Sequence, residues 1–255
     1  MTHYASAEAW AQGPDRVYGE LARVAVDLLP GPLDGRLVLD AGSGTGAASR
    51  ALTARGARVL ATDQSPAMLG YQSTARPPAV AADVAALPLP DCCVDGVVAS
   101  FVLSHVDRPE AALAELARVT RSGGTVLVTA FTAGGPAHPV KVAVDGVLAR
   151  YGYTPPAWYA ALKGAGELRV GVPASLTALA TGAGLHRTEL VSLAIDVSVL
   201  GPTALAAWRL GMAQTAPWLA ALPPAARSDV DSACIDAVAA TPPTPLGVLV
   251  LLATT

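Results

Sequence analysis

The sequence predicts an α/β protein in which a mostly parallel sheet carries helices on both faces. Short apolar runs of strand length alternate with helix-length segments between residues 37 and 131, a pattern typical of parallel strands joined by helices. Several of these runs also end at a polar residue, and such sheets bind ligands at the carboxyl ends of their strands. The length of 255 residues suits one domain with insertions.

A helix is expected before the sheet. Val17, Leu21, Val24 and Leu28 fall on one face at helical spacing, and Pro30-Gly31-Pro32 ends the segment.

The stretch around the first strand is the most informative in the chain. Leu37–Leu39 is an apolar strand that ends at Asp40, and it is followed by Gly42-Ser43-Gly44-Thr45-Gly46 and by a helix over Ala47–Arg55. Glycines allow positive φ angles and bring the main chain close to a ligand, while the helix start offers free N–H groups. The turn alone leaves open NAD, a phosphate, S-adenosylmethionine or a turn without a ligand.

A second strand, Arg58–Asp63, also ends in an acid. A carboxylate has two acceptor oxygens that match the two hydroxyl donors of a ribose. Asp63 could equally cap the helix that starts near Gln64-Ser65-Pro66, and the two roles are compatible.

Three further strands complete this half of the chain. Ala79–Ala82 is followed by Asp83, Val94–Ser100 is followed by a segment that reaches His105, and Thr125–Phe131 comes last. Between the last two, a helix is expected to start with Asp107 as its N-cap and to stop at Ser122-Gly123-Gly124. Polar groups therefore follow four strand ends and should share one crevice: Asp40, Asp63, Asp83 and the segment from Ser100 to His105.

The second half is harder to interpret. A helix is expected over Pro173–Ala183, a strand within His186–Val199, two helices within Gly201–Ala240 and a last strand at Leu246–Thr254. Aromatic residues gather between positions 151 and 159 in a chain with 5% aromatics. They could form a lid over an apolar or aromatic substrate, or pack a small helical insertion.

Composition limits the partners and the location. The net charge is −3 and the basic residues are scattered, which disfavours nucleic acid. No apolar run is long enough to span a bilayer and no leader pattern is visible, so a cytoplasmic location is expected. Cys92, Cys93 and Cys234 are expected to be reduced, and no metal-ligand cluster is visible.

Four segments together resemble the class I S-adenosylmethionine-dependent methyltransferases, and in particular the small-molecule enzymes of the ubiquinone-biosynthesis type. The resemblance runs from about residue 37 to residue 131 and rests on these segments: Asp40-Ala41-Gly42-Ser43-Gly44-Thr45-Gly46, Asp63-Gln64-Ser65-Pro66-Ala67-Met68-Leu69, Asp83 with Leu87-Pro88-Leu89-Pro90-Asp91, and His105-Val106 with Arg118-Val119-Thr120-Arg121-Ser122-Gly123-Gly124. It implies a Rossmann-like, doubly wound sheet of seven strands, with helical insertions at 132–170 and 200–242 that form a substrate cap on a single domain.

The resemblance also implies how S-adenosylmethionine is held. Asp40 would hold the methionine amino end directly or through water, and Asp63 would bind the ribose diol. The turn between them would give backbone access to the methionine and ribose through Gly42, Ser43, Gly44 and Gly46.

The adenine would lie between the next two strand ends. Gln64 and Met68 would flank it, Asp83 would accept from its exocyclic amine, and the Val84 N–H would bond a ring nitrogen.

The remaining contacts would lie around the sulfonium and above it. Ser100 and His105 would lie near the sulfonium, and residues 1–35 would form a lid with Trp10, Arg16 and Tyr18 as candidate lid residues. Tyr18 is also expected to contact the cofactor.

The implied reaction is in-line methyl transfer to a small, fairly apolar molecule, expected to be a bacterial secondary metabolite, with S-adenosylhomocysteine as product. His105 is the first candidate base and His138 the second, although His105 could instead shape the cofactor site. The alternative is an enzyme that binds S-adenosylmethionine on the same fold but catalyses a cyclisation or rearrangement. We expect a monomer or homodimer.

Overall fold

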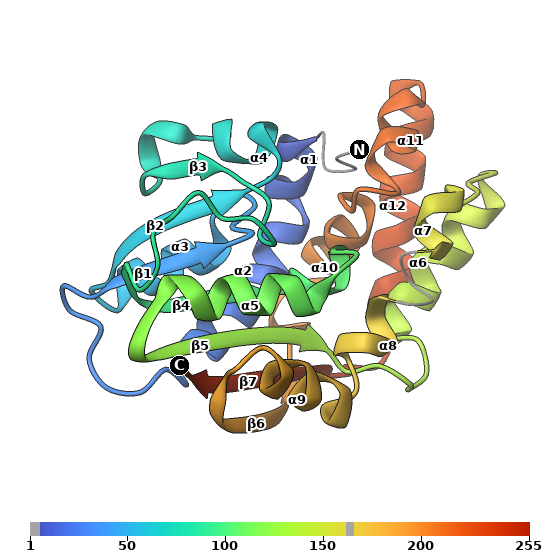
Figure 1. Cartoon of the computed structure of the whole chain (residues 1–255). Coiled ribbons are helices and arrows are strands. Elements are labelled where there is room, and N and C mark those ends of the chain that lie inside the picture. The colour runs from blue at the N-terminus through green and yellow to red at the C-terminus, as the bar shows by residue number, and fades with distance from the viewer. Residues whose placement is uncertain (1–5, 162–165) are drawn as a thin grey trace.

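The computed structural model describes residues 6–161 and 166–255, and its centre is a seven-stranded sheet in the order β3-β2-β1-β4-β5-β7-β6. Strands β1 to β5 are parallel, whereas β7 runs antiparallel to both of its neighbours. The predicted α/β fold with a mostly parallel sheet is therefore confirmed (Figure 1). The strands are β1 (Leu37–Ala41), β2 (Arg58–Asp63), β3 (Ala79–Ala81), β4 (Val94–Ser100), β5 (Thr120–Phe131), β6 (His186–Ile195) and β7 (Leu246–Thr254).

Two apolar layers bury the two faces of the sheet, because neighbouring residues of a strand point to opposite sides. In β1, for example, Val38 belongs to one layer and Leu39 to the other. The first layer contains α2 (Pro14–Val26), α3 (Ala47–Ala54), α6 (Pro139–Arg150), α10 (Gly201–Leu210) and α12 (Pro224–Ala239). The second contains α5 (Pro109–Val119) and α9 (Pro173–Gly182).

Short helices complete the chain and lie mostly in its connections. They are α1 (Ala7–Gln12), α4 (Pro66–Gly70), α7 (Ala157–Ala161), α8 (Glu167–Val170) and α11 (Ala216–Ala221), with the 3-10 turns η1 (Ser73–Ala75), η2 (Leu103–His105) and η4 (Ser198–Leu200). In the described part of the chain, no helix has the length and apolar character needed to cross a membrane.

Three local predictions were wrong. Helix α5 starts at Pro109 with Arg108 at its N-cap position, so Asp107 does not cap it. Strand β5 starts at Thr120 because Thr120 already pairs with Val94 of β4, and an irregularity in the register separates this pair from the regular pairing that begins at Thr125. The segment 201–240 holds three helices, because Met212–Ala216 turns the chain between α10 and α11.

The N-terminal helices are tied to the glycine turn and to α10. Asp15 on α2 accepts a 2.5 Å hydrogen bond from Thr45 Oγ1 and pairs with Arg50. A Cβ added at Gly13 would lie 2.0 Å from the Ala207 carbonyl oxygen, so only glycine permits this approach of α2 to α10. These contacts hold the start of α2 above the carboxyl end of the sheet.

The helices of the second half gather at the same end of the sheet. Figure 1 shows α6, α7, α11 and α12 beyond the point where β5 ends. Helices α6, α10 and α12 share one apolar layer with α2. The segments 139–161 and 201–239 therefore stand beside the carboxyl ends of the strands, where ligands bind in such sheets.

Candidate active site

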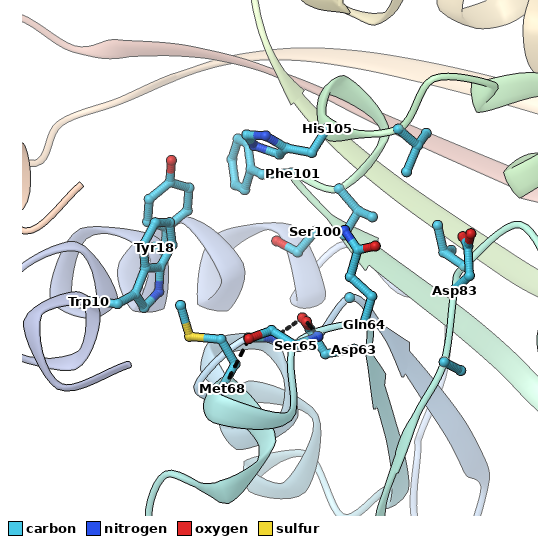
Figure 2. Close-up of a pocket in the computed structure, with 16 residues that line it drawn as sticks. Trp10, Tyr18, Asp63, Gln64, Ser65, Met68, Asp83, Ser100, Phe101 and His105 are labelled. Carbon is cyan, nitrogen blue, oxygen red and sulfur yellow. Dashed lines mark hydrogen bonds between the residues drawn. The ribbon is translucent and has the colours of Figure 1, made fainter. Parts of the chain in front are cut away.

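A cleft opens at the carboxyl ends of β1, β2, β3 and β4, and we call it the strand-end cleft. Each strand end contributes a short segment, and α1 and α2 close the remaining side with Trp10 and Tyr18. Figure 2 shows these two rings on one side of the cleft and Asp83 on the opposite side. Its lining comprises Trp10, Tyr18, Gly42, Gly44, Asp63, Gln64, Ser65, Met68, Ala82, Asp83, Val84, Ser100, Phe101, Val102, His105 and Val106.

The glycine turn forms the floor next to β1. Gly42 has φ +72°, and a Cβ there would lie 2.3 Å from Val102 Cγ2, so the packing as well as the backbone requires glycine. Gly44 has φ +52° and donates its N–H to Asp63 Oδ2 at 2.8 Å. The main chain of the turn is therefore held against β2 and faces the cleft directly.

Asp63 is the central acid of the cleft. Its Oδ2 accepts from Gly44 and its Oδ1 accepts from the Ser65 N–H, both at 2.8 Å. Burial raises the pKa of this carboxyl, and the two backbone donors oppose that shift. Each oxygen keeps acceptor capacity beyond its backbone bond, so the carboxylate can still accept from two ligand hydroxyls.

Asp40 does not line the cleft, so of the two expected modes of contact the structure leaves room only for the one through water. It is 1% exposed, and its Oδ2 accepts from Ser49 Oγ at 2.6 Å. Its Oδ1 is buried with no hydrogen-bond partner among the described residues, and burial raises the pKa of the carboxyl to about 6. The side chain lies inside β1 and faces α3, which leaves one polar atom unsatisfied behind the glycine turn.

Ser43 and Gly46 also lie outside the cleft lining. Ser43 is buried and accepts from Arg76, and Gly46 takes φ +97° at the N-cap of α3. The alternation of side chains along the turn explains this, since Gly42 and Gly44 face the cleft and the residues between and after them face the helix side.

Arg76 is a site residue that the sequence did not reveal. Its Nη1 donates to the carbonyl oxygens of Gly44 at 3.1 Å and Met68 at 2.8 Å, and its Nη2 donates to Ser43 Oγ at 2.9 Å. One guanidinium thus joins the glycine turn to α4. Arg76 follows a short 3-10 turn and belongs to no recognisable motif, so no sequence signal pointed to it.

The third and fourth strand ends form the far side of the cleft. Asp83 is exposed, and its Oδ1 accepts from the Ala85 N–H at 2.9 Å, which fixes the loop after β3. Met68 is buried beneath the cleft, whereas Gln64 is exposed at its edge. Figure 2 shows Met68 and Ser65 close to Asp63, with the Ser65 backbone bonded to its carboxylate.

An aromatic wall borders the cleft. Tyr18 stacks on Trp10 with ring centroids 5.2 Å apart and meets Phe101 edge-on at 5.3 Å. Phe101 follows β4 with φ +58°, a conformation that bulky residues rarely adopt and that is often found at functional sites. Burial raises the pKa of the Tyr18 hydroxyl, which therefore stays protonated at neutral pH. Arg16 is exposed and lies outside the cleft lining.

A second, smaller cavity lies behind this wall, and we call it the aromatic cavity. It encloses about 70 Å³. Tyr18, Phe101 and His105 line both cavities, so the two meet at these side chains. The remaining lining residues are Ser104, Phe131, Trp158, Tyr159, Glu167, Trp208, Arg209, Met212 and Gln214.

The two histidines proposed as bases have different surroundings. His105 lies in η2 and faces both cavities. His138 lines neither of them; its Nδ1 accepts from the Val140 N–H and its Nε2 bonds the Thr244 carbonyl at 2.8 Å. The structure therefore uses His138 as the N-cap of α6 and does not bring it to the site.

Among the described residues, no group of three or more His, Cys, Asp or Glu side chains could hold a metal ion.

Comparison with known protein families finds a match to the family described as "Methyltransferase domain" over residues 39–128. A demethylmenaquinone methyltransferase of Mycobacterium bovis is 40% identical over 120 residues, which cover 47% of this chain and 50% of that protein. The corresponding protein of Thermobifida fusca is 39% identical over 127 residues, covering 47% and 52%. The chain thus spans about half the length of the curated relatives it matches.

Two solved structures show how far the fold extends. A putative methyltransferase from an antibiotic biosynthesis pathway of Anabaena variabilis has a TM-score of 0.62 at 18% identity, covering 92% of this chain and 96% of that one. The [4+2]-cyclase SpnF has a TM-score of 0.55 at 20% identity, covering 94% and 80%. At these identities the likeness establishes the shared fold over nearly the whole chain.

Proposed function

We propose that this protein, which carries a class I S-adenosylmethionine-dependent methyltransferase domain of the ubiquinone and menaquinone type, transfers a methyl group from S-adenosylmethionine to a small molecule with an apolar or aromatic body. The observation that carries the proposal is the meeting of two cavities at Tyr18, Phe101 and His105. The strand-end cleft is lined by polar groups that suit the cofactor. The aromatic cavity is lined by rings that suit the body of the acceptor.

The residues of the strand-end cleft fit S-adenosylmethionine. The Asp63 carboxylate has acceptor capacity for a ribose diol, and Gly42 and Gly44 leave the main chain open for a close approach. The unsatisfied Asp40 Oδ1 behind the turn can accept from an ammonium group through a bridging water. On the far side, Asp83 and the Val84 N–H are available to the edge of an adenine ring, with Met68 beneath it.

When bound, S-adenosylmethionine supplies an electrophilic methyl group on a positively charged sulfur. An electron pair of the acceptor forms the new bond to the methyl carbon, the carbon–sulfur pair stays on sulfur, and the acceptor loses its proton. The protein has to align the acceptor and exclude water, and the rings of Tyr18, Phe101 and Trp10 form an apolar enclosure suited to both tasks.

His105 is the one histidine of the described chain that faces both cavities. A base is useful only where the acceptor carries a proton, and a base in this position typically accelerates transfer by about 10² to 10⁴-fold. We propose His105 for that role or for shaping the site around the sulfur, and we no longer propose His138, whose ring nitrogens are both engaged away from the site.

We also propose that residues 1–35 serve as the lid and that the segments 132–170 and 200–242 serve as the cap over the acceptor; residues 1–5 and 162–165 of these ranges lie outside the described residues. Trp10 and Tyr18 support the lid, and Trp158, Trp208 and Met212 support the cap. A bacterial secondary metabolite is the proposed acceptor, in keeping with the antibiotic-pathway methyltransferase of the same fold.

Release of S-adenosylhomocysteine tests the proposal. The protein is incubated with S-adenosylmethionine and a panel of single-ring phenols and hydroxybenzoates, and the thioether product and the mass of the acceptor are followed. We expect equimolar S-adenosylhomocysteine and an acceptor 14 Da heavier, the mass of the CH₂ that a methyl replacing a proton adds. If S-adenosylmethionine binds but is never consumed while an acceptor is rearranged, the non-methylating alternative, which shares its fold with SpnF, replaces this proposal.

A further inference from the structure

We propose that the aromatic cavity selects an acceptor that carries a carboxylate on a single aromatic ring, and that Arg209 binds this carboxylate. This inference rests on the proposed function, because it names the class of molecule that the cap accepts. It starts from a charged side chain in the aromatic cavity that the cofactor role leaves unexplained.

Arg209 on α10 is buried without a counter-ion. The residue is 7% exposed and lines the aromatic cavity. Across the described residues, no carboxylate lies within 4.0 Å of its guanidinium, and Nε is buried without a hydrogen-bond partner. Its nearest charge-related contact is the Trp208 ring, whose centroid lies 5.5 Å from the guanidinium carbon.

Such an arrangement is costly unless a ligand completes it. Removing a charge from water requires compensation by pairing and hydrogen bonds, and a cation–π contact supplies only a part of it. A guanidinium presents parallel N–H donors that match the two oxygens of a carboxylate. The cavity therefore offers an anion a pair of donors that no group among the described residues uses.

The other charged group of the cavity does not neutralise Arg209. Glu167 lines the same cavity, but its carboxylate is farther than 4.0 Å from the guanidinium. A ligand that is anionic at one end only can meet Arg209 while its uncharged part faces Glu167. Gln214 and Ser104 add uncharged polar groups to the lining.

The rings around Arg209 indicate an aromatic body for the ligand. Phe131 lies 4.5 Å from Phe101 and 6.0 Å from Tyr18 between ring centroids, so a nearly continuous aromatic surface leads from the cavity to the strand-end cleft. A planar ring on this surface would place its carboxylate at Arg209 and its opposite edge at the wall shared with the cleft. A cavity of about 150 Å³ holds one benzene ring, so the cavity of about 70 Å³ here would take a single ring only where that ring extends into the adjoining strand-end cleft.

Titration with benzoate and with benzamide, its uncharged isostere, tests the proposal by calorimetry or ligand-observed NMR. The protein is measured both alone and with saturating S-adenosylhomocysteine. We expect benzoate to bind about ten times more tightly than benzamide, in line with a charge-assisted pair. Equal affinity for the two probes, or no binding of benzoate, overturns the proposal.

Three variants localise the effect. Arg209→Met should remove the preference for benzoate. Arg209→Lys should retain part of it, because a lysine keeps the positive charge but lacks the two parallel N–H donors of the guanidinium. Arg36→Met, a matched change at an exposed arginine at the start of β1, should leave it unchanged. A preference that survives in a folded Arg209→Met protein contradicts the assignment, and the comparison in the unmodified protein holds even if that variant fails to fold.

The two proposals fail in different ways. Failure of the proposed function would appear as S-adenosylmethionine that is never converted to S-adenosylhomocysteine, whether or not benzoate binds more tightly than benzamide. Loss of the carboxylate site would appear as equal binding of the two probes in a protein that still binds S-adenosylhomocysteine.

Discussion

The strand-end cleft and the aromatic cavity differ in how the chain builds them. The cleft takes its polar groups from short segments that each follow a strand, within the stretch from Gly42 to Val106, and α1 and α2 add only two rings. The aromatic cavity draws on α2, η2, β5, α7, α8 and α10, which are spread from Tyr18 to Gln214.

This difference indicates that the two cavities answer to different requirements. A parallel sheet brings its strand ends together whatever the rest of the chain does, so a binding site there depends on local turns. A cavity built from distant helices depends on how those helices pack, and its lining can change without disturbing the sheet. The cleft is thus suited to a constant ligand and the cavity to a variable one.

The largest effect is expected from removing Asp63, the central acid of the cleft, which tests whether the two cavities bind their ligands independently. Asp63→Ala deletes both carboxylate oxygens and releases the N–H groups of Gly44 and Ser65. Because charge-assisted hydrogen bonds contribute about 1.5–3 kcal/mol each, we expect at least a ~100-fold loss of S-adenosylhomocysteine affinity by calorimetry. Benzoate affinity should stay within about twofold.

Asp229→Ala, a change at an exposed acid of α12, is the matched control and should leave both affinities unchanged. Full retention of S-adenosylhomocysteine affinity in Asp63→Ala would remove the ribose assignment.

The reciprocal change is made in the cavity. Phe131 lines the aromatic cavity but not the cleft, and its ring packs on Phe101. Phe131→Ala should weaken benzoate binding about tenfold, since an aromatic pair and buried ring area are lost. The affinity for S-adenosylhomocysteine should hardly change. The benzoate affinity of Phe131→Leu should lie between those of the unmodified protein and Phe131→Ala. An equal loss of both ligands would show that the cavities are not separate.

Arg76 allows a finer test, because it acts through the turn and not through the ligand. Arg76→Met removes the bonds to Gly44, Ser43 and Met68 without changing the cleft lining. We expect S-adenosylhomocysteine affinity to fall about tenfold, as a turn that has to be ordered on binding costs free energy.

Arg58→Met, at an exposed arginine of the neighbouring surface groove, should have no effect. Arg76→Lys should restore part of the affinity for S-adenosylhomocysteine if Arg76 positions the turn, since a lysine can reach some of the acceptors of Arg76 but not all. A purely structural loss would not be rescued in this way.

The smallest effect concerns pH. The pKa of Asp40 is about 6 in the folded protein against an ordinary value of 3.8, so the folded state binds more protons between these values. The contribution of Asp40 to the free energy of unfolding therefore rises as the pH falls through 6. The rise is about 1 kcal/mol between pH 7.5 and pH 5. Urea unfolding of wild type and Asp40→Asn at both pH values should show this difference between the proteins. A difference that is independent of pH would contradict the raised pKa.

Sequence reasoning reached the fold and most of the cleft for the same physical reason. Strand length, glycine turns and the acids after β2 and β3 are local signals, and parallel pairing then brings them together. It left open whether Asp40 would contact the ligand directly or through water, because a position near a strand end does not reveal which way the side chain points; here it faces Ser49 on α3.

The aromatic cavity could not be predicted from such local sequence signals. Arg209 and Trp208 lie in a helix that reads as an ordinary apolar segment, and nothing near them in sequence marks a ligand site. They meet Tyr18 only because α10 packs against α2, where Gly13 allows close contact with Ala207. The same holds for Arg76, whose partners include Ser43 and Gly44 in a turn that is distant in sequence.

Tyr18, Phe101 and His105 separate two cavities, and this couples the binding of a ligand in one cavity to the binding of a ligand in the other. Any displacement of these side chains by one ligand alters the room left for the other, so the affinities for the two ligands are coupled. The factor by which S-adenosylhomocysteine changes benzoate affinity must equal the factor by which benzoate changes S-adenosylhomocysteine affinity. A factor above one would mean that each ligand favours the binding of the other through these three side chains.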